Sequence, residues 1–307
     1  MGYKKRRLYA VRVDTYFIRH TKTLDIDQNT RNRLWDERRI AIHFPDAVVG
    51  SEWPDRDSTS LDPTHYKGSG RVALARLASL AASGGYVFAE HHARRETMVG
   101  LVEPNSRVEI WGGTWGKRLG RAGQVAVLKS IRLSRVRLID PSRIVPLSAG
   151  RPRQGTIMRW PRAGDDVVNL VEGRASKPGL RNLSPQQQEI ICSEYLRTTQ
   201  ASESGLPILA KLLLPVGGTL RDIDILGLTP DGSRIFAQVT FGNSKKSASK
   251  LDQLKKYAGR KCHLVFFCEC ERQSFRDGVH EVPIGEVYEA LKKDKIGRLW
   301  LKAAAGE

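Results

Sequence analysis

The sequence predicts an α/β (α+β) chain of two domains, with a β-rich N-terminal half and a C-terminal mixed sheet flanked by helices. Its 307 residues exceed the span of a typical single domain, so two hydrophobic cores are expected. Residues 150–183 are rich in Gly, Pro and Arg without a sustained hydrophobic period, which is typical of a linker. We therefore expect one domain over residues 1–149, a linker over 150–183 and a second domain over 184–307.

Charge separates the two halves more clearly than hydropathy does. The chain has a formal net charge of +18; residues 1–183 carry 33 basic and 18 acidic side chains, whereas residues 184–307 carry 18 and 15. Such an excess favours a polyanionic partner, and nucleic acid is the commonest one because each phosphate contact releases counterions. A merely soluble basic surface is the alternative. We expect the N-terminal half to bind nucleic acid, with DNA preferred and RNA left open.

The chain has no feature of a membrane or secreted protein. No apolar run approaches the ~18 residues of a membrane span, and the basic start from Met1 to Arg7 leads into alternating residues rather than an apolar leader. Four cysteines are too few for a disulfide framework in a chain of this length. A cytoplasmic protein without membrane contact is expected.

The N-terminal half is predicted to form a small mixed barrel with one or two helices. Alternating apolar residues predict strands, and Gly84-Gly85 ends the second helical segment. Strands are expected at Leu8–Val13, Ile40–Phe44, Tyr86–Glu90, Met98–Val102, Arg107–Trp111 and Val125–Ile139, and helices at about Asn29–Arg38 and Arg71–Ala82.

Aromatic residues near basic ones mark a candidate substrate-binding surface in this half. Trp111 and Trp115 flank a Gly-Gly-Thr segment, and Trp35 precedes Arg38 and Arg39. Two rings on a flexible backbone are suited to hold a base that has left the DNA stack. The alternative is that the tryptophans fill the core of the barrel. The hypothesis assigns all five side chains to substrate binding.

The C-terminal half is predicted to run helix, hairpin, helix, strand, helix. Its first helix begins at Ser184, which forms a capping box with Gln187 and is followed by Pro185 in the first turn. The segment Thr229–Ser233 is a hairpin-type turn. The remaining elements are strands Arg221–Leu228 and Arg234–Phe241, a helix from about Ala248 to Gly259, a strand Leu264–Cys268 and a helix Ile284–Lys293.

Polar side chains gather on one face of the predicted hairpin. If Leu228 pairs with Arg234, then Asp224 faces Gln238 and Asp222 faces Thr240. Acidic residues are depleted in the middle of ordinary strands, so two of them call for an explanation beyond structure. The opposite face is expected to be core and carries Ile223, Ile225, Ile235, Ala237, Val239 and Phe241.

Two helical residues extend this polar set. Glu194 follows Ile190 and Ile191 at helical spacing, which places its carboxylate on the apolar face of the first helix. Lys250 lies on the apolar stripe of the following helix. The alternatives are a glutamate at the edge of the stripe that reaches solvent and a lysine whose stem is buried while its ammonium reaches water. If all converge, Glu194, Asp224, Gln238 and Lys250 meet at one edge of the sheet.

The run from Gly217 to Thr240, GGTLRDIDILGLTPDGSRIFAQVT, preceded by a helix with Glu194, resembles the PD-(D/E)XK nuclease superfamily, especially its Mrr-like restriction endonucleases. The resemblance covers about 110 residues and implies a restriction-endonuclease-like fold. It also implies that Asp224 binds metal, that Gln238 replaces the second acid and that Glu194 is the helical glutamate. Thr240 departs from the pattern, because the family has lysine there; the resemblance then requires Lys250 as a relocated lysine.

The resemblance implies hydrolysis of a phosphodiester bond. Mg²⁺ held by Asp224, Gln238 and the carbonyl of Val239 would activate water. Lys250 would orient that water or offset charge on the phosphate, and Glu194 would hold a metal-bound water or a second ion.

The segment that begins at Trp35, WDERRIAI, resembles in its pattern PUA-like modules such as EVE and SRA domains, which read modified bases. The resulting hypothesis is a Mg²⁺-dependent DNA endonuclease, a restriction enzyme that recognises modified bases through its N-terminal domain. Two alternatives remain open: a degenerate nuclease fold that only binds nucleic acid, and a structure-specific or RNA-directed nuclease. A homodimer is plausible because cutting both strands often takes two active sites.

Overall fold

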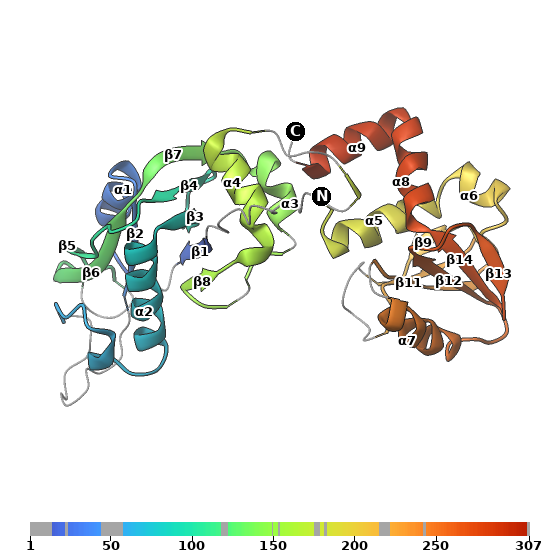
Figure 1. The fold of residues 1–307 in the computed structure, drawn as a ribbon, viewed down its shortest axis with the longest axis horizontal. Helices are drawn as coiled ribbons and strands as arrows, with labels where there is room; N and C mark the ends of the chain where they lie inside the picture. The colour runs from blue at the N-terminus through green and yellow to red at the C-terminus, as the bar shows by residue number, and fades with distance from the viewer. Residues whose placement is uncertain are drawn as a thin grey trace, which may run out of the picture. The chain divides into compact units, whose positions relative to one another are not determined.

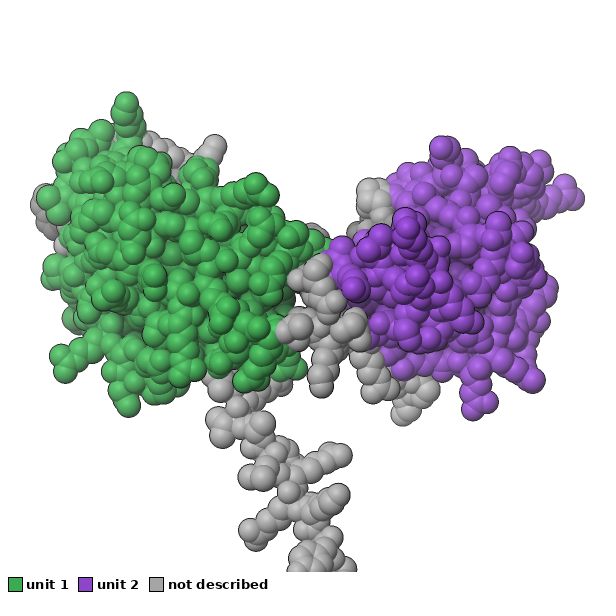
Figure 2. Space-filling model, turned by 90° about the horizontal axis from the view of Figure 1, so that it is seen from above, with its two compact units in different colours: residues 1–176 green, residues 177–307 purple. Residues whose placement is uncertain are grey.

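The computed structural model describes residues 14–21, 24–43, 58–117, 122–148, 150–152, 154–174, 179–180, 183–214, 222–241 and 244–305. The chain divides into two compact units, Met1–Ser176 (unit 1) and Lys177–Glu307 (unit 2), which Figure 2 colours separately. The strand expected at Leu8–Val13 lies outside the described residues. Among the described helices, none combines the length and the apolar character that crossing a bilayer would require.

The described residues of unit 1 form two sheets (Figure 1). The larger has the order β7-β4-β3-β1-β8, where only the pairing of β1 with β3 is parallel; its strands are β1 (Thr15–His20), β3 (Gly85–His91), β4 (Thr97–Val102), β7 (Ser134–Ile139) and β8 (Ile157–Arg159). The smaller is antiparallel, has the order β2-β6-β5 and consists of β2 (Arg39–Ile42), β5 (Glu109–Thr114) and β6 (Val125–Arg132). The helices are α1 (Gln28–Asp36), α2 (Gly68–Ser83), α3 (Val145–Ser148) and α4 (Gly164–Glu172).

The described strands of unit 1 form two separate sheets, so the expected PUA-like barrel is not seen. The predicted single strand Val125–Ile139 is two strands, β6 and β7, which belong to different sheets. Leu133 between them is buried against the core that the two sheets share with α2. Alternating apolar residues run through both strands, and therefore the sequence pattern does not reveal the change of sheet.

Helices cover the large sheet on both faces. Helix α2 packs Leu74, Leu77 and Leu80 against one face, in a core that also includes isoleucines of the small sheet. Helix α4 packs Val167 and Leu170 against the opposite face.

Much of the segment expected as a linker therefore belongs to the core of unit 1. Residues 157–172 form β8, a 3-10 turn and α4, and the buried Trp160 contacts Phe17 and Phe88 edge to face. The sequence-based prediction missed α4 because Gly, Pro and Arg are frequent around its short apolar stripe. Only contact with the sheet makes that stripe a core element, because a helix of nine residues is marginal in isolation.

In unit 2 the strands that the structure describes form one six-stranded mixed sheet, with the order β13-β14-β12-β11-β10-β9. Its strands are β9 (Lys211–Leu212), β10 (Ile225–Leu228), β11 (Arg234–Val239), β12 (Cys262–Cys268), β13 (Ser274–Arg276) and β14 (Val279–Pro283). Its helices are α5 (Pro185–Tyr195), α6 (Thr199–Glu203), α7 (Ser244–Lys255), α8 (Ile284–Lys293) and α9 (Lys295–Ala305). The expected capping box of Ser184 and Gln187 is present at the start of α5.

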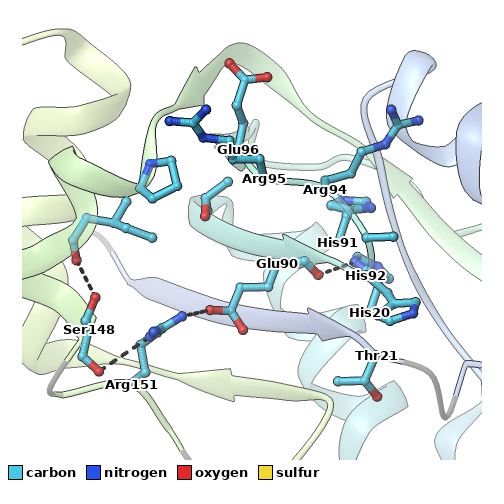
Figure 3. Close-up of a pocket in the computed structure, with 14 residues that line it drawn as sticks. His20, Thr21, Glu90, His91, His92, Arg94, Arg95, Glu96, Ser148 and Arg151 are labelled. Atoms are coloured by element: carbon cyan, nitrogen blue, oxygen red, sulfur yellow. Dashed lines mark hydrogen bonds and ion pairs between the residues drawn. The ribbon is translucent and has the colours of Figure 1, made fainter.

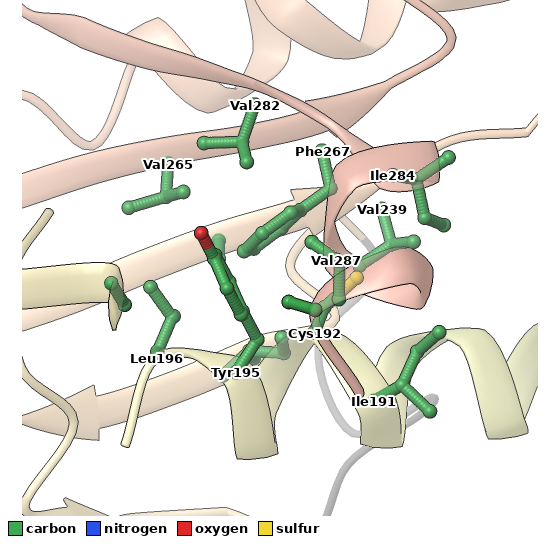
Figure 4. Close-up of a cluster of buried hydrophobic side chains, with 14 of the residues drawn as sticks. Ile191, Cys192, Tyr195, Leu196, Val239, Val265, Phe267, Val282, Ile284 and Val287 are labelled. Atoms are coloured by element: carbon green, nitrogen blue, oxygen red, sulfur yellow. The ribbon is translucent and has the colours of Figure 1, made fainter. Parts of the chain in front are cut away.

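The sheet of unit 2 lies between helices, with α5 and α8 on one side and α7 on the other (Figure 1). Tyr195 of α5 and Val287 of α8 pack with Phe267 at the centre of the first layer, as Figure 4 shows. Leu254 of α7 packs with Phe236 and Leu264 on the other face. The expected mixed sheet flanked by helices is therefore present.

The hairpin of β10 and β11 has the predicted register, with Leu228 paired to Arg234 and Ile225 to Ala237. One part of the expectation is wrong: Ile223 packs with Phe236 on the α7 side, whereas Ile225 lies in the core on the α5 side. Regular pairing stops at Ile225, and the alternation of faces is lost there. The break occurs at Asp224, where the candidate site begins.

Candidate active site

Asp224 lies at the start of β10 with its carboxylate turned onto β11. Its Oδ2 accepts a hydrogen bond of 2.8 Å from the Val239 amide and one of 2.5 Å from Nε2 of Gln238. The side chain takes the place that a backbone carbonyl would have in a continued ladder, which explains why the strand ends here. Burial raises the pKa of Asp224, and the Val239 amide, the Lys250 ammonium and the Gln238 amide oppose this rise.

Gln238 is almost fully buried and offers one free oxygen. A carboxylate oxygen only accepts, so the amide nitrogen of Gln238 must face Asp224. Its Oε1 then points elsewhere, is buried and has no hydrogen-bond partner among the described residues. The sequence-based expectation that Asp224 and Gln238 lie on one face of the hairpin agrees with this geometry.

Lys250 reaches the same place from α7. Its Nζ donates a hydrogen bond of 3.2 Å to the carbonyl oxygen of Val239, and its side chain is half-buried. The ammonium therefore turns toward the sheet edge rather than into solvent. Because a carbonyl oxygen has two lone pairs, this contact leaves Val239 one further acceptor position.

Glu194, expected as the helical glutamate, does not join this set. Its side chain is 48% exposed and lies 3.9 Å from Arg197, one turn along the helix. The buried residues of α5 are instead Gln187, Gln188, Ile191, Cys192, Ser193 and Tyr195. Ile190, on which the expectation for Glu194 rested, is only half-buried, and the buried face of α5 is turned away from Glu194.

Glu189 is the acidic residue that α5 brings to the site. Burial and the charge of Asp224 raise its pKa to about 7, and the positive charge of Lys250 opposes them. Its Oε2 is buried without a hydrogen-bond partner among the described residues. Glu189 precedes the buried Cys192 by three positions, but Glu194 follows the buried Ile191 by three, so helical spacing alone does not identify Glu189 in the sequence.

Thr240 follows Gln238 by two residues and is also buried. Its amide donates a hydrogen bond of 2.8 Å to the Phe267 carbonyl, which continues the pairing with β12. Its Oγ1 has no partner in the described part of the chain, so the hydroxyl stays available. Asp222, the residue expected opposite Thr240, lies before β10 and is half-buried.

Three oxygens of these residues are buried without a partner in the described part of the chain: Glu189 Oε2, Gln238 Oε1 and Thr240 Oγ1. Leaving a buried polar atom unpaired costs about 1–3 kcal/mol, so such atoms call for a ligand or a water. Carboxylate, amide and carbonyl oxygens are the ligands that Mg²⁺ prefers.

The donor set fits a hard cation that keeps part of its water shell. Within the described ranges no group of three or more His, Cys, Asp or Glu is placed to hold a metal. The candidate site has two carboxylates, on Glu189 and Asp224, and would complete its oxygen set with Gln238 and the Val239 carbonyl. Magnesium is often held by one or two carboxylates together with waters and substrate phosphate, so this set is sufficient.

The structure places the predicted N-terminal binding residues differently from expectation. Trp111 and Trp115 are 7% and 2% exposed and belong to the core beneath α1, so neither ring is free to stack on a base. Arg39 is engaged by two carboxylates, those of Glu37 and Glu109.

The two other predicted residues of this surface are accessible. Arg38 is exposed at the end of α1, with a left-handed backbone (φ 57°). Trp35 is half-buried, with its ring edge against His91 and the Arg94 guanidinium over its face. Single-sequence patterns do not tell a core tryptophan from a surface one, because both follow the same alternation.

Comparison with known proteins adds only distant similarities. The sequence matches no protein-family model and no curated protein. Among solved structures, the MspJI restriction endonuclease in complex with a 27-mer oligonucleotide has 12% identity and a TM-score of 0.27, over 78% of this chain and 70% of that chain. The EndoMS-dsDNA2 complex has 12% identity and a TM-score of 0.20, over 83% and 93%. At TM-scores this low, the similarity defines neither the fold nor the function of this chain.

Proposed function

We propose that unit 2 is a Mg²⁺-dependent nuclease that hydrolyses phosphodiester bonds of DNA. The observation that carries the proposal is the meeting of Asp224, Gln238 and Lys250 at the junction of β10, β11 and α7. Val239 joins the two charged side chains, because its amide binds Asp224 and its carbonyl binds Lys250. The strong net positive charge of the chain supports a polyanionic substrate.

The proposed cation site consists of Asp224, Gln238 Oε1 and the Val239 carbonyl. When bound there, Mg²⁺ would lower the pKa of a water molecule and offset the charge of the scissile phosphate. Lys250 would hold the phosphate or the attacking water through its ammonium group. Glu189, with a pKa near neutrality, would accept a proton from water at Oε2.

A more specific form of the proposal is that the chain is a restriction enzyme whose unit 1 recognises modified bases. The support for this assignment is that contacts with the phosphate backbone carry little sequence information. A nuclease site in unit 2 would therefore leave the recognition of particular bases to unit 1. Cleavage of both strands by one site per chain would call for a homodimer.

A binding protein with a degenerate nuclease fold is the second candidate. Its support is Thr240, which stands in the place where the resembling family has lysine. The contact between Lys250 and Val239 favours the enzyme, because Lys250 supplies at the site the ammonium group that Thr240 lacks.

Nicking of supercoiled plasmid by the purified chain tests the proposal. We expect nicking with Mg²⁺, none with a chelator, and none for Asp224→Asn, which keeps the hydrogen-bonding shape but removes the charge. Substrates of plain, methylated, hydroxymethylated and glucosylated DNA test the reading of modified bases, and equal cleavage of all four would exclude it. If Asp224→Asn nicks as fast as the wild type, the enzyme proposal fails.

A further inference from the structure

Helix α1 turns a row of amide and guanidinium groups outward from unit 1. Its buried residues are Thr30 and Leu34, which face the small sheet. Figure 1 shows the helix at the periphery of the unit. With 3.6 residues per turn, the face opposite the buried one is accessible and carries Gln28, Asn29, Asn32 and Arg33.

This composition is a poor choice for helix stability alone. Asparagine and threonine are weak helix formers, and three of the nine residues of α1 are of these types. Glutamate or lysine would give a solvated face with a better helix propensity. The helix is held instead by Asp27, whose Oδ1 accepts a hydrogen bond of 2.7 Å from the Thr30 amide, and by Leu34, which is 1% exposed. The amide groups therefore indicate a task at the surface.

Two of the amide side chains are held in a defined orientation. Arg94 donates a hydrogen bond of 2.8 Å to Oδ1 of Asn32, and Nε2 of Gln28 donates one of 3.0 Å to the same oxygen. A guanidinium group only donates, so the Asn32 oxygen must face Arg94. These bonds leave Oε1 of Gln28 as an acceptor and Nδ2 of Asn32 as a donor for a further partner.

The turn between β3 and β4 fixes Arg94 beside α1. Its guanidinium lies over the ring of Trp35, 5.2 Å from the ring centre. Ala93 has a left-handed backbone (φ 63°), which is unfavourable for a residue other than glycine, and the Arg94 amide donates to the His91 carbonyl at 3.2 Å. Figure 3 shows Arg94 and Arg95 next to each other on this turn. The turn and the helix thus present their polar groups as one surface.

This surface is basic. Residues 28–38 and 92–96 expose two acidic side chains, Asp36 and Glu96, and four arginines: Arg33, Arg38, Arg94 and Arg95. The side chain of Arg95 is 82% exposed, and its ion pair with Asp140 is 3.4 Å long. Guanidinium groups bind phosphate through paired N–H donors, so a polyanion is the partner that this surface favours.

The amide groups distinguish DNA from other polyanions. An amide side chain can donate to N7 of adenine while it accepts from the N6 amino group, and both atoms lie in the major groove. That groove is about 12 Å wide and admits one α-helix. An anionic membrane or an acidic peptide would attract the arginines but would offer the amide row no comparable partner.

We propose that α1 enters the major groove of duplex DNA, where Gln28, Asn29 and Asn32 contact base edges while Arg94 and Arg95 contact phosphates. The proposal rests on the DNA-binding part of the proposed function and is independent of hydrolysis. The bases are read within the intact duplex, so none leaves the stack. The surface takes the place of Trp111 and Trp115, which are buried.

The first test is selection from a library of random-sequence duplexes. It uses the full chain with Asp224→Asn, without metal, so that DNA is bound and not cut. We expect the chain to enrich a short motif that contains adenine. In that motif, 7-deazaadenine, which lacks the major-groove acceptor N7, should weaken binding by about tenfold. The matched analogue 3-deazaadenine, which lacks the minor-groove acceptor N3, should change it by less than about twofold. No enriched motif, or the reverse order of the two analogues, would overturn the proposal.

Variants of α1 form the second test. The triple change Gln28→Ala, Asn29→Ala and Asn32→Ala should abolish the preference for the motif over a scrambled duplex. Affinity for the scrambled duplex should stay within about threefold, because the phosphate contacts remain. Alanine favours the helix, so the melting temperature should not fall and loss of folding is excluded as the cause. An unchanged preference would overturn the proposal.

A third set of variants separates the phosphate contacts from general charge. Arg94→Ala with Arg95→Ala should weaken binding to the motif and to the scrambled duplex by about tenfold. Arg71→Ala with Arg107→Ala removes two exposed arginines of other segments and should weaken binding by less than about threefold. Equal losses for the two pairs would contradict the proposed phosphate contacts.

The two proposals can fail separately. A chain that cleaves DNA but keeps its sequence preference after the triple change would lose only the role of α1. A chain that selects a motif through α1 but never cleaves would keep that role and lose the nuclease assignment.

Discussion

The ammonium of Lys250 lies 3.2 Å from the carbonyl oxygen of Val239, the residue whose amide binds the carboxylate of Asp224. Both charged side chains are thus tied to the two polar groups of a single residue on β11. Lys250→Ala should lower kcat for DNA nicking by about 100-fold or more, because a positive group aimed at developing charge is lost.

Lys256→Ala is the matched control for this change. Lys256 is exposed just beyond the end of α7, and its removal subtracts the same charge without touching the sheet edge. Its nicking rate should stay within about threefold of the wild type. Equal rates for both variants would remove Lys250 from the reaction.

Glu189 and Glu194 form a second matched pair, on one helix. Glu189→Gln should lower the nicking rate by about 100-fold because it removes the carboxylate that α5 brings to the site. Glu194→Gln should leave the rate nearly unchanged, since that side chain is 48% exposed and faces Arg197. Initial rates at saturating plasmid measure both; the reverse order would restore Glu194 as the helical glutamate.

Thr240→Val separates function from stability. The hydroxyl of Thr240 is buried without a partner among the described residues, so replacing it with a methyl group should leave the melting temperature unchanged or raise it. The nicking rate should fall if the hydroxyl orients water at the site. Thermal unfolding and nicking of the same preparation decide the matter; a large loss of stability would mean that the hydroxyl has a structural partner.

His20 and His91, whose rings stack in unit 1, should make the stability of this unit depend on pH. Folding lowers the pKa of His20 to about 4 and that of His91 to about 2, below the ordinary 6.5. Between about pH 6.5 and 4 the unfolded chain therefore binds more protons than the folded chain, and stability falls as the pH falls through this window. His91→Phe keeps an aromatic ring but cannot be protonated, so it should lose less stability than the wild type between pH 7 and 5.

His65→Gln is the control for the histidine prediction. His65 is exposed, and its replacement removes one histidine without touching the stacked pair. An identical slope for His91→Phe and the wild type would show that the buried pair does not drive the effect.

Helix α4 gives a prediction about the boundary of unit 1. Leu170 is 7% exposed and packs on the large sheet, so Leu170→Ala should destabilise unit 1 by about 2–4 kcal/mol. Leu138, which is 46% exposed on β7, offers a control: Leu138→Ala should cost about 1 kcal/mol or less. Equal small effects would support the flexible linker that the composition predicts.

Local patterns carried a large part of the prediction in unit 2. The capping box at Ser184 and the turn at Thr229–Ser233 each involve residues only a few positions apart, so their physics is readable in one stretch of sequence. The register of the hairpin follows from that turn, and it brings Gln238 opposite Asp224. The same reasoning assigned Ile223 to the wrong face, because it assumed regular alternation through a strand that stops at Ile225.

What the sequence by itself determined is therefore the local geometry: helix starts, hairpin register, the polar pair on β10 and β11, and the basic character of the chain. The tertiary structure alone decided which carboxylate of α5 lies near Asp224, because the rotation of a helix about its axis is set by its contacts with the sheet, and here they bring Glu189 and not Glu194 to the site. It also decided that Trp111 and Trp115 are core and that α4 is not a linker. Burial is a property of contacts between distant segments, and no short pattern encodes those contacts.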